Sequence, residues 1–191
     1  DPLITEILKS SGGSIYYSFP KQYPDYIPVT FYGWMPANLQ LVKASNEIFQ
    51  RLESVLDVRF EETYDANGLN IVAISQNIQT NTAGLSYFPN SEFQLGSDVF
   101  ISTDFSNPSF INAELTNYDY EVLVHEIGHA LGLKHPFEED NSNTVVLSDH
   151  EDANRFTAMT YNDHEAYFNG DFRVLDWMAL TQLYGVNASY S

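Results

Sequence analysis

The sequence has no cysteine among its 191 residues. Disulfide bonds, thiolate metal sites and cysteine nucleophiles are therefore excluded within this chain. No apolar run approaches the roughly 20 residues that a membrane-spanning helix needs, so we expect no membrane insertion. The chain also begins at Asp1, without a methionine or a basic, apolar leader. We therefore expect that any signal peptide or pro-segment was removed or lies outside this sequence.

Basic residues are scarce, with 8 Lys and Arg against 26 Asp and Glu and a formal net charge of -18. Such a field repels nucleic acid and anionic membrane surfaces, so we expect neither as a partner. A solvated acidic surface and a cation-handling role both account for the excess charge. The apolar fraction of 43% and the aromatic fraction of 15% are those of a folded globular protein. A chain of this length favours one domain with its own core.

Apolar periodicity predicts three helices. Apolar residues at three- and four-residue steps predict an amphipathic helix over 37–56, with Pro36 tolerated at its first turn. Further helices are predicted over 117–131 and from about 173 to 183, with Gly185 just past the end of the last one. Residues 136–156 are polar and poorly periodic, which predicts a long loop.

Short runs rich in β-branched and aromatic residues predict strands between turn-forming residues. These runs lie at 14–19, 28–33, 57–62, 69–75, 84–89 and 98–102. Residues 1–13 close on Ser-Ser-Gly-Gly and are predicted to form a flexible lead-in. The order of elements predicts a single α/β unit.

Residues 125–135 read HEIGHALGLKH and hold three of the five histidines. His125 and His129 lie four residues apart on a predicted helix, so both rings share one face. Two neutral imidazoles at this spacing can bind one zinc ion at roughly 2.0–2.1 Å. Glu126 cannot easily bind the same ion, but it can hold a water bound to that ion. This arrangement is typical of a general base that acts on a metal-bound water.

Gly132 accounts for the third histidine of this stretch. Glycine accepts the left-handed conformation at a helix C-terminus, so the predicted helix can end there. A turn at Gly132 lets His135 approach the ion from another direction, and Pro136 stiffens the exit. Three histidines leave a fourth position open, as in a catalytic zinc site. The alternative, ordinary surface histidines, does not explain five residues at fixed spacing.

The pattern from His125 to His135 matches the HExxHxxGxxH signature of the metzincin metallopeptidases. The segment FTAMTY at 156–161 resembles the Met-turn of that clan. The resemblance implies that Met159 lies beneath the three histidines as a hydrophobic floor and is not a ligand. Without the motif before it, a methionine in a loop would be ordinary core filler.

Within the clan, the chain resembles the serralysin family most. HEIGHALGLKHP is similar to the active-site run of that family, and LDWMALTQLYGVN at 175–187 is similar to the close of its catalytic domain. The resemblance implies that Tyr161 binds the resting zinc and then moves to the transition-state oxyanion, where a phenol can donate a hydrogen bond. A packing tyrosine is the alternative. Astacin-like and matrix-metalloproteinase-like peptidases are disfavoured by the His135-Pro136 junction, Tyr161 and the LYG close.

The resemblance is dense over 118–187 and thinner before it. Lys134 stands where the family usually has a small polar residue. The chain lacks the C-terminal calcium-binding β-roll repeats of serralysins, so residues 1–191 are expected to be one catalytic domain, either cut from a longer protein or a minimal member. A cysteine-switch pro-segment cannot operate from within a chain without cysteine.

The resemblance implies an α/β (α+β) metzincin fold, with a twisted, mixed five-stranded sheet, two backing helices and a C-terminal helix. The active-site cleft would follow the sheet edge. Residues 84–89 are a candidate for the edge strand that pairs with a peptide, and an internal strand is the alternative. The implied protein is a secreted, monomeric zinc endopeptidase that acts on proteins or peptides, with Glu126 as general base. A protein inhibitor or a pro-segment would be its regulatory partner.

Two alternatives concern metals. The first is a metzincin-like adhesion or binding module that keeps zinc for stability without turnover. Glu126 argues against it, because a purely structural site has no use for a carboxylate beside an open position. The second is calcium, since acidic residues surround His150 and His164. No EF-hand or β-roll spacing supports a specific calcium site, and solvated surface histidines are the expectation there.

Overall fold

The computed structural model describes residues 13–28, 33–64, 70–77, 82–103, 117–139, 143–162 and 170–189. Most of the predicted lead-in, most of the strand predicted at 28–33, and His164 lie outside the described residues. In the described part, none of the helices is both long and apolar enough to cross a membrane.

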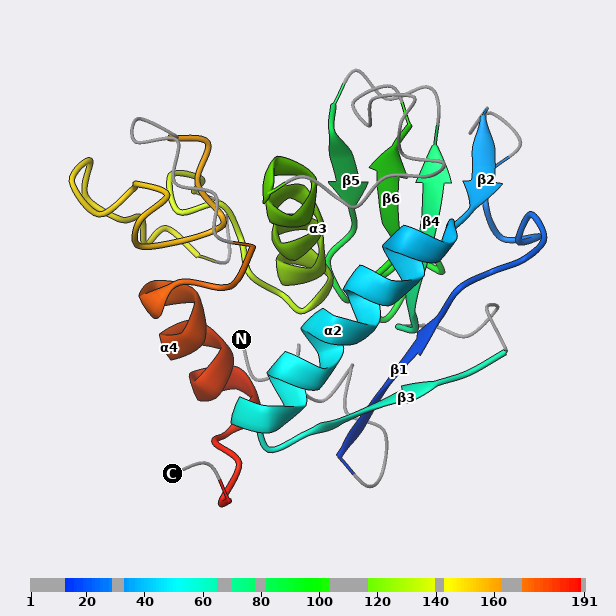
Figure 1. Ribbon diagram of the computed structural model, residues 1–191. Coiled ribbons are helices and arrows are strands. Elements are labelled where there is room, and N and C mark those ends of the chain that lie inside the picture. Colours follow the sequence, from blue (N-terminus) through cyan, green and yellow to red (C-terminus); the bar gives the residue numbers. More distant parts are fainter. Residues whose placement is uncertain are drawn as a thin grey trace.

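The strands form a mixed sheet with the order β3-β1-β4-β6-β5 (Figure 1). Neighbouring strands along β3, β1, β4 and β6 run parallel, and β5 runs antiparallel to β6. A sixth strand, β2, pairs antiparallel with the last residues of β4. The predicted α/β class is confirmed, and five strands make up the main path. The strands are β1 (Ser14–Ser18), β2 (Trp34–Pro36), β3 (Arg59–Glu62), β4 (Val72–Asn77), β5 (Gly84–Ser86) and β6 (Val99–Ser102).

The three described helices are α2 (Leu39–Val55), α3 (Asn117–Ala130) and α4 (Val174–Tyr184). All three were predicted, but the prediction that Pro36 lies in the first turn of α2 is wrong. Asn38 caps the helix, because its side chain accepts the Leu41 N–H at 2.8 Å. Pro36 instead ends the short strand β2, where a residue without an N–H is tolerated.

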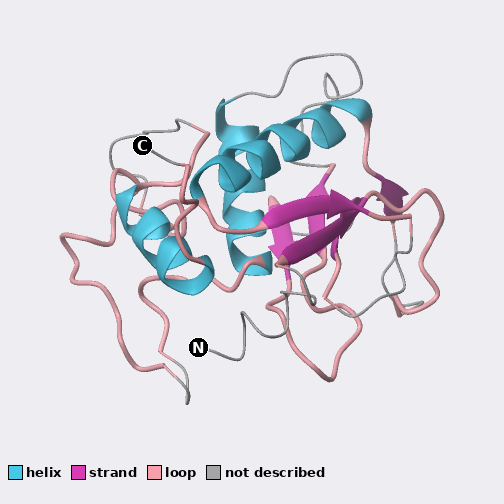
Figure 2. Cartoon of the chain, turned by 90° about the horizontal axis from the view of Figure 1, so that it is seen from below, coloured by secondary structure: helices cyan, strands magenta, loops and turns pink. Residues whose placement is uncertain are grey.

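Helices α2 and α3 cover one face of the sheet (Figures 1 and 2). Successive strand side chains point to opposite faces, and β6 shows this alternation. Val99 and Ile101 join the large core beneath the helices, whereas Phe100 packs on the other face with Ile27 and Leu95. The alternation of β6 therefore divides the apolar residues into a main core and a smaller cluster.

The end of α4 is fastened to both other helices. The buried Tyr184 hydroxyl donates to the Leu131 carbonyl at 2.7 Å, just past the end of α3. Gly185 then adopts a φ of 79°, in the left-handed region, and the Asn187 N–H donates to Val55 at the end of α2. Tyr184 thus joins α4 to the end of α3, which carries His125 and His129, and Asn187 joins the chain after α4 to the end of α2.

One carboxyl group beside β6 is almost completely buried and has no ion-pair partner among the described residues. Asp98 is 2% exposed at the start of β6, and its described side-chain partner is the Tyr26 hydroxyl at 3.4 Å. Burial raises the pKa of Asp98 to about 8, and the Tyr26 hydrogen bond opposes that shift only in part.

This pKa makes stability depend on pH. A carboxyl group whose folded pKa lies above its unfolded value stabilises the fold below the unfolded value, and this contribution is lost as pH rises through the folded pKa. We therefore expect Asp98→Asn to gain stability relative to the unmutated protein as pH rises from 5 to 8. The relative gain should reach at least about 1 kcal/mol, or roughly 2–4 °C in Tm. Thermal unfolding at several pH values would check this, and a pH-independent difference would contradict it.

Candidate metal centre

The end of α3 is shaped by Gly132, as its predicted role requires. The helix ends at Ala130, and Gly132 adopts a φ of 97°. Its N–H donates to His129 O at 2.9 Å, and the Leu133 N–H donates to Gly128 O at 2.9 Å. This pair of bonds is a Schellman motif, which reverses the chain after a helix. The reversal brings His135 back toward the helix.

The three predicted histidines converge on one point. The Nε2 atoms of His125 and His129 lie 3.1 Å apart, and those of His129 and His135 lie 3.0 Å apart. The third distance, between His125 and His135, is 3.2 Å. Two nitrogens bound to a tetrahedral zinc ion at its usual distances are roughly 3.3 Å apart. The triangle of nitrogens therefore has the size that such an ion requires.

Backbone carbonyls determine which ring nitrogens carry protons. His125 Nδ1 lies 2.8 Å from Ala158 O, and His129 Nδ1 lies 2.6 Å from Leu133 O. A carbonyl oxygen only accepts, so each Nδ1 carries the proton and each Nε2 presents a lone pair. Burial lowers the pKa of His125 to about 4 and that of His129 to about 3. Both rings are therefore neutral near pH 7, and their facing lone pairs fit a bound cation.

The third histidine has a carboxylate as its neighbour. His135 Nδ1 lies 2.9 Å from Glu138 Oε1, at the range of an ion pair although not aligned as a regular hydrogen bond. The backbone of Glu138 is in turn bound by the Lys134 ammonium group, which also donates to Val145 O at 2.7 Å. Lys134 thus joins two parts of the loop that follows His135, one at Glu138 and one at Val145.

Glu126 lies beside the triad in a buried position. Its side chain is 7% exposed and accepts a hydrogen bond from the Ser86 hydroxyl at 2.5 Å. Burial raises the pKa of Glu126 to about 7, and the Ser86 hydrogen bond works against that rise. A carboxyl group that titrates near neutral pH can both accept and return a proton.

Met159 packs against α3 between the two helical histidines. It is 2% exposed, and a Cβ added to Gly128 would lie 2.6 Å from its sulfur. Gly128 therefore makes room for the methionine directly beneath the helix turn that carries His125 and His129. The role of Met159 as a floor beneath the histidines stays a prediction.

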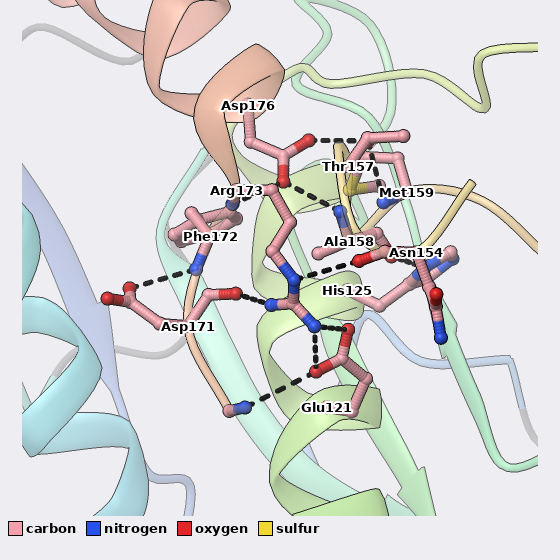
Figure 3. A network of polar contacts seen from close by, with 11 residues as sticks. Glu121, His125, Asn154, Thr157, Ala158, Met159, Asp171, Phe172, Arg173 and Asp176 are labelled. Carbon is pink, nitrogen blue, oxygen red and sulfur yellow. Dashed lines mark hydrogen bonds and ion pairs between the residues drawn. The ribbon is translucent and has the colours of Figure 1, made fainter. Parts of the chain in front are cut away.

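A polar network connects residues 157–159, in the segment that resembles a Met-turn, to α4 (Figure 3). Both carboxylate oxygens of Asp176 accept hydrogen bonds from the turn, one from Thr157 Oγ1 at 2.6 Å and one from the Ala158 N–H at 2.7 Å. The carbonyl of the same Ala158 accepts from His125. Asp176 therefore positions a histidine ring through one intervening residue.

Arg173 anchors this network on its other side (Figure 3). Its buried guanidinium group contacts both carboxylate oxygens of Glu121 at 2.7 and 2.8 Å, and Nε donates to Asn154 O at 2.9 Å. Glu121 lies one turn before His125 on α3. The ion pair joins the first turns of α3 to the start of α4, the bond to Asn154 O adds the loop before residue 156, and a buried ion pair is costly to break.

Aromatic rings surround the exposed side of the triad. The Tyr161 ring is 68% exposed, with its centroid 4.5 Å from that of His135 and 5.7 Å from that of His125. Phe137 stacks on His135 at 5.1 Å, and Phe88 meets His129 edge-on at 5.3 Å. Partial burial and the nearby carboxylates of Glu126 and Glu138 raise the pKa of Tyr161, so its phenol stays protonated at neutral pH.

The positioning residues were not identified from the sequence. Alternation in β5 places Gly84 and Ser86 on one face, but the helix opposite that face cannot be read from the pattern. Asp176 and Arg173 are charged residues in an otherwise apolar helix pattern. That contrast could have marked them in the sequence as residues with buried polar partners. Among the described residues, the three histidines are the one converging group that could hold a metal, so a calcium site has no support there.

Comparison with known proteins defines the class. A family model described as Metallo-peptidase family M12 matches residues 23–169. The chain is 27% identical to Serralysin G of Dickeya chrysanthemi over 195 residues, which cover 93% of this chain and 40% of that protein. It is 27% identical to the serralysin of Photorhabdus luminescens over 195 residues, covering 94% and 40% of the two chains. With the serralysin of Proteus mirabilis it shares 30% identity over 161 residues, covering 71% and 32%.

The fold and the histidine triad are those of a metzincin-like metallopeptidase domain related to the serralysins. The chain belongs to metallo-peptidase family M12. It spans about 40% of the length of Serralysin G and of the Photorhabdus luminescens serralysin.

The contact between Glu138 and His135 generates a prediction about metal affinity. A carboxylate beside the far nitrogen of a ligating histidine orients the ring and raises its basicity, and its loss typically weakens metal binding 10–100-fold. Because Glu138 is half-exposed, we expect Glu138→Gln to weaken zinc binding by about 10-fold with little change in Tm. Competition with a chromophoric chelator would measure this. Glu139→Gln, one residue further along, is the matched control, and equal affinities in the two variants would contradict the prediction.

Proposed function

We propose that this domain is a zinc-dependent endopeptidase that hydrolyses peptide bonds in proteins or peptides. The observation that carries the proposal is the set of three histidine Nε2 atoms, 3.0–3.2 Å apart, beside the buried carboxyl group of Glu126. A purely structural zinc site has four protein ligands, whereas three leave a position for water or substrate. Family membership supports peptide hydrolysis as the reaction.

Zinc, when bound by the three histidines, would acidify a water molecule and polarise the scissile carbonyl. Glu126 accepts the proton of the attacking water and delivers it to the leaving amine. Its raised pKa serves both steps, because a carboxyl group near pKa 7 gains and loses a proton at neutral pH at little cost. The apolar surroundings that raise this pKa also strengthen its interaction with developing charge.

Tyr161 would donate a hydrogen bond to the oxyanion, and in the resting site it would help to hold the metal. Its protonated phenol lies over the rings of His135 and His125, on the exposed side of the triad. Because most of the Tyr161 ring is exposed, its side chain has room to rotate between two positions. A hydrogen bond that forms only as negative charge develops lowers the barrier without tightening substrate binding.

The substrate would pair with β5. This strand lies at the end of the sheet path, has β6 as its partner, and leads directly to Phe88 beside His129. An extended peptide added to that edge forms main-chain hydrogen bonds and reads backbone more than side chains. The active-site cleft predicted along this edge is part of the proposal.

Residues 1–191 would work as one catalytic domain, secreted and monomeric, with a protein inhibitor or a pro-segment as its regulator. A binding module that keeps zinc without turnover is not favoured. The buried Glu126 has no structural ion pair among the described residues and is instead held by a single hydroxyl group. Such a carboxylate suits proton transfer better than it suits stability.

Removing the carboxylate tests the proposed base. We expect Glu126→Ala to retain about one zinc per chain and to lose about 10²–10⁴-fold in kcat/KM on an unfolded protein substrate. Cleavage assays run beside metal quantification in both proteins would measure this. Undiminished cleavage by the variant would remove Glu126 from the mechanism.

Removing the phenol hydroxyl tests Tyr161. Since the ring is exposed, Tyr161→Phe should leave Tm and zinc content unchanged while kcat falls by about 10–10³-fold. Tyr64→Phe, at an exposed ring elsewhere on the surface, is the matched control. A fully active Tyr161→Phe protein would return this residue to a packing role.

A further inference from the structure

The face of β5 that meets α3 carries two small residues. Directly opposite residues in an antiparallel pair share a face of the sheet. Gly84 lies opposite Ile101 and Ser86 lies opposite Val99, both of which belong to the core beneath the helices. Gly84 and Ser86 therefore point toward α3, while Leu85 packs with the cluster on the other face.

These two residues enclose the Glu126 side chain. Ser86 Oγ donates to Glu126 Oε2 at 2.5 Å, the length of a strong hydroxyl–carboxylate hydrogen bond. A Cβ added to Gly84 would lie 2.5 Å from Glu126 Cγ and 2.6 Å from Oε1, well inside van der Waals contact. The serine supplies a directional bond, and the glycine supplies the space that the carboxylate occupies.

We propose that β5 positions the catalytic carboxylate, with Ser86 and Gly84 as its positioning residues. This inference rests on the proposed function. A hydroxyl bond to one carboxylate oxygen fixes the rotation of the group and leaves the other oxygen available to water. Because Gly84 has no Cβ, the carboxylate can pack directly against the backbone of the strand. The same strand would bind the substrate through its backbone. Strand β5 would therefore fix the position of the peptide relative to the Glu126 carboxylate.

A positioning role differs from a structural role in what it changes. Misplacement of a reacting group by about 1 Å can cost 10²-fold in rate. The substrate binds the backbone edge of β5, which a side-chain change leaves intact, so KM should not move. The metal is bound by α3 and the following turn, so zinc content should not move either.

The first arm of the test removes and restores the hydroxyl group. We expect Ser86→Ala to lower kcat by about 10–100-fold, with KM within about 2-fold and one zinc per chain. Ser86→Thr keeps the hydroxyl on a β-branched residue that strands accept, and it should recover most of kcat. Ser45→Ala removes a buried hydroxyl bonded to Leu41 O in α2 and is the control for loss of a serine. Full kcat in Ser86→Ala, or a loss confined to KM, would overturn the proposal.

The second arm fills the space. Gly84 has no left-handed φ, so alanine is compatible with its backbone, and the strain that it adds is the overlap with the Glu126 side chain. We expect Gly84→Ala to fold normally and bind zinc but to lose at least about 10-fold in kcat, because the added methyl group displaces Glu126. An unchanged kcat in a folded Gly84→Ala protein would contradict the proposal.

A double-mutant cycle separates failure of this inference from failure of the proposed function. Ser86→Ala, Glu126→Ala, which leaves no acceptor for the Ser86 hydroxyl, and the double variant are compared by denaturant unfolding, which needs no turnover. Non-additive effects support the Ser86–Glu126 bond, and additive effects overturn it. A zinc-loaded, unmutated protein that cleaves nothing would overturn the proposed function and the catalytic role of β5 with it, whatever the cycle gives.

Discussion

The site depends on one electrostatic constraint, which is that the Nε2 atoms of three imidazole rings face one another, 3.0–3.2 Å apart, and that those of His125 and His129 present lone pairs. Without a cation between them, such lone pairs repel. Burial keeps His125 and His129 neutral, so neither of these two rings relieves that repulsion by taking up a proton at neutral pH. Their orientation is maintained because each Nδ1–H donates to a backbone carbonyl. These hydrogen bonds fix both rings through Nδ1, so Nε2 of each ring remains available to a metal.

The rest of the fold keeps those carbonyls in place. One is Leu133 O, which the turn at Gly132 brings back beneath His129. The other is Ala158 O, in a loop with no regular structure of its own. Asp176 holds that loop from α4, and the buried pair of Arg173 and Glu121 joins α4 to α3. Segments far apart in the sequence thus converge on one histidine ring (Figure 3).

Much of the fold and the convergence of the three histidines could be predicted from the sequence, because both leave local patterns. The helices follow from periodicity, and the candidate ligands follow from the spacing of His125, Glu126, His129, Gly132 and His135. The predicted start of α2 was wrong by a few residues, since Pro36 suits both the first turn of a helix and the end of a short strand. The cap at Asn38 decided between them.

The residues that position the ligands could not be found in this way, because their partners are distant in sequence. Ser86 and Glu126 are 40 residues apart, and Arg173 and Glu121 are 52 apart. The sequence of residues 84–89 does not indicate that Gly84 and Ser86 face the carboxylate of Glu126. Only the register of β5 on β6, and the place of α3 above that face, bring them together.

The measurement that tests the central claim most directly is X-ray absorption at the zinc edge of the zinc-loaded protein. The account predicts three imidazole ligands at roughly 2.0–2.1 Å, completed by one or two oxygen ligands and no sulfur. A spectrum without the multiple scattering of histidine rings, or one dominated by carboxylate oxygens, would show that the metal binds elsewhere. In that case the convergence of His125, His129 and His135 would have another cause.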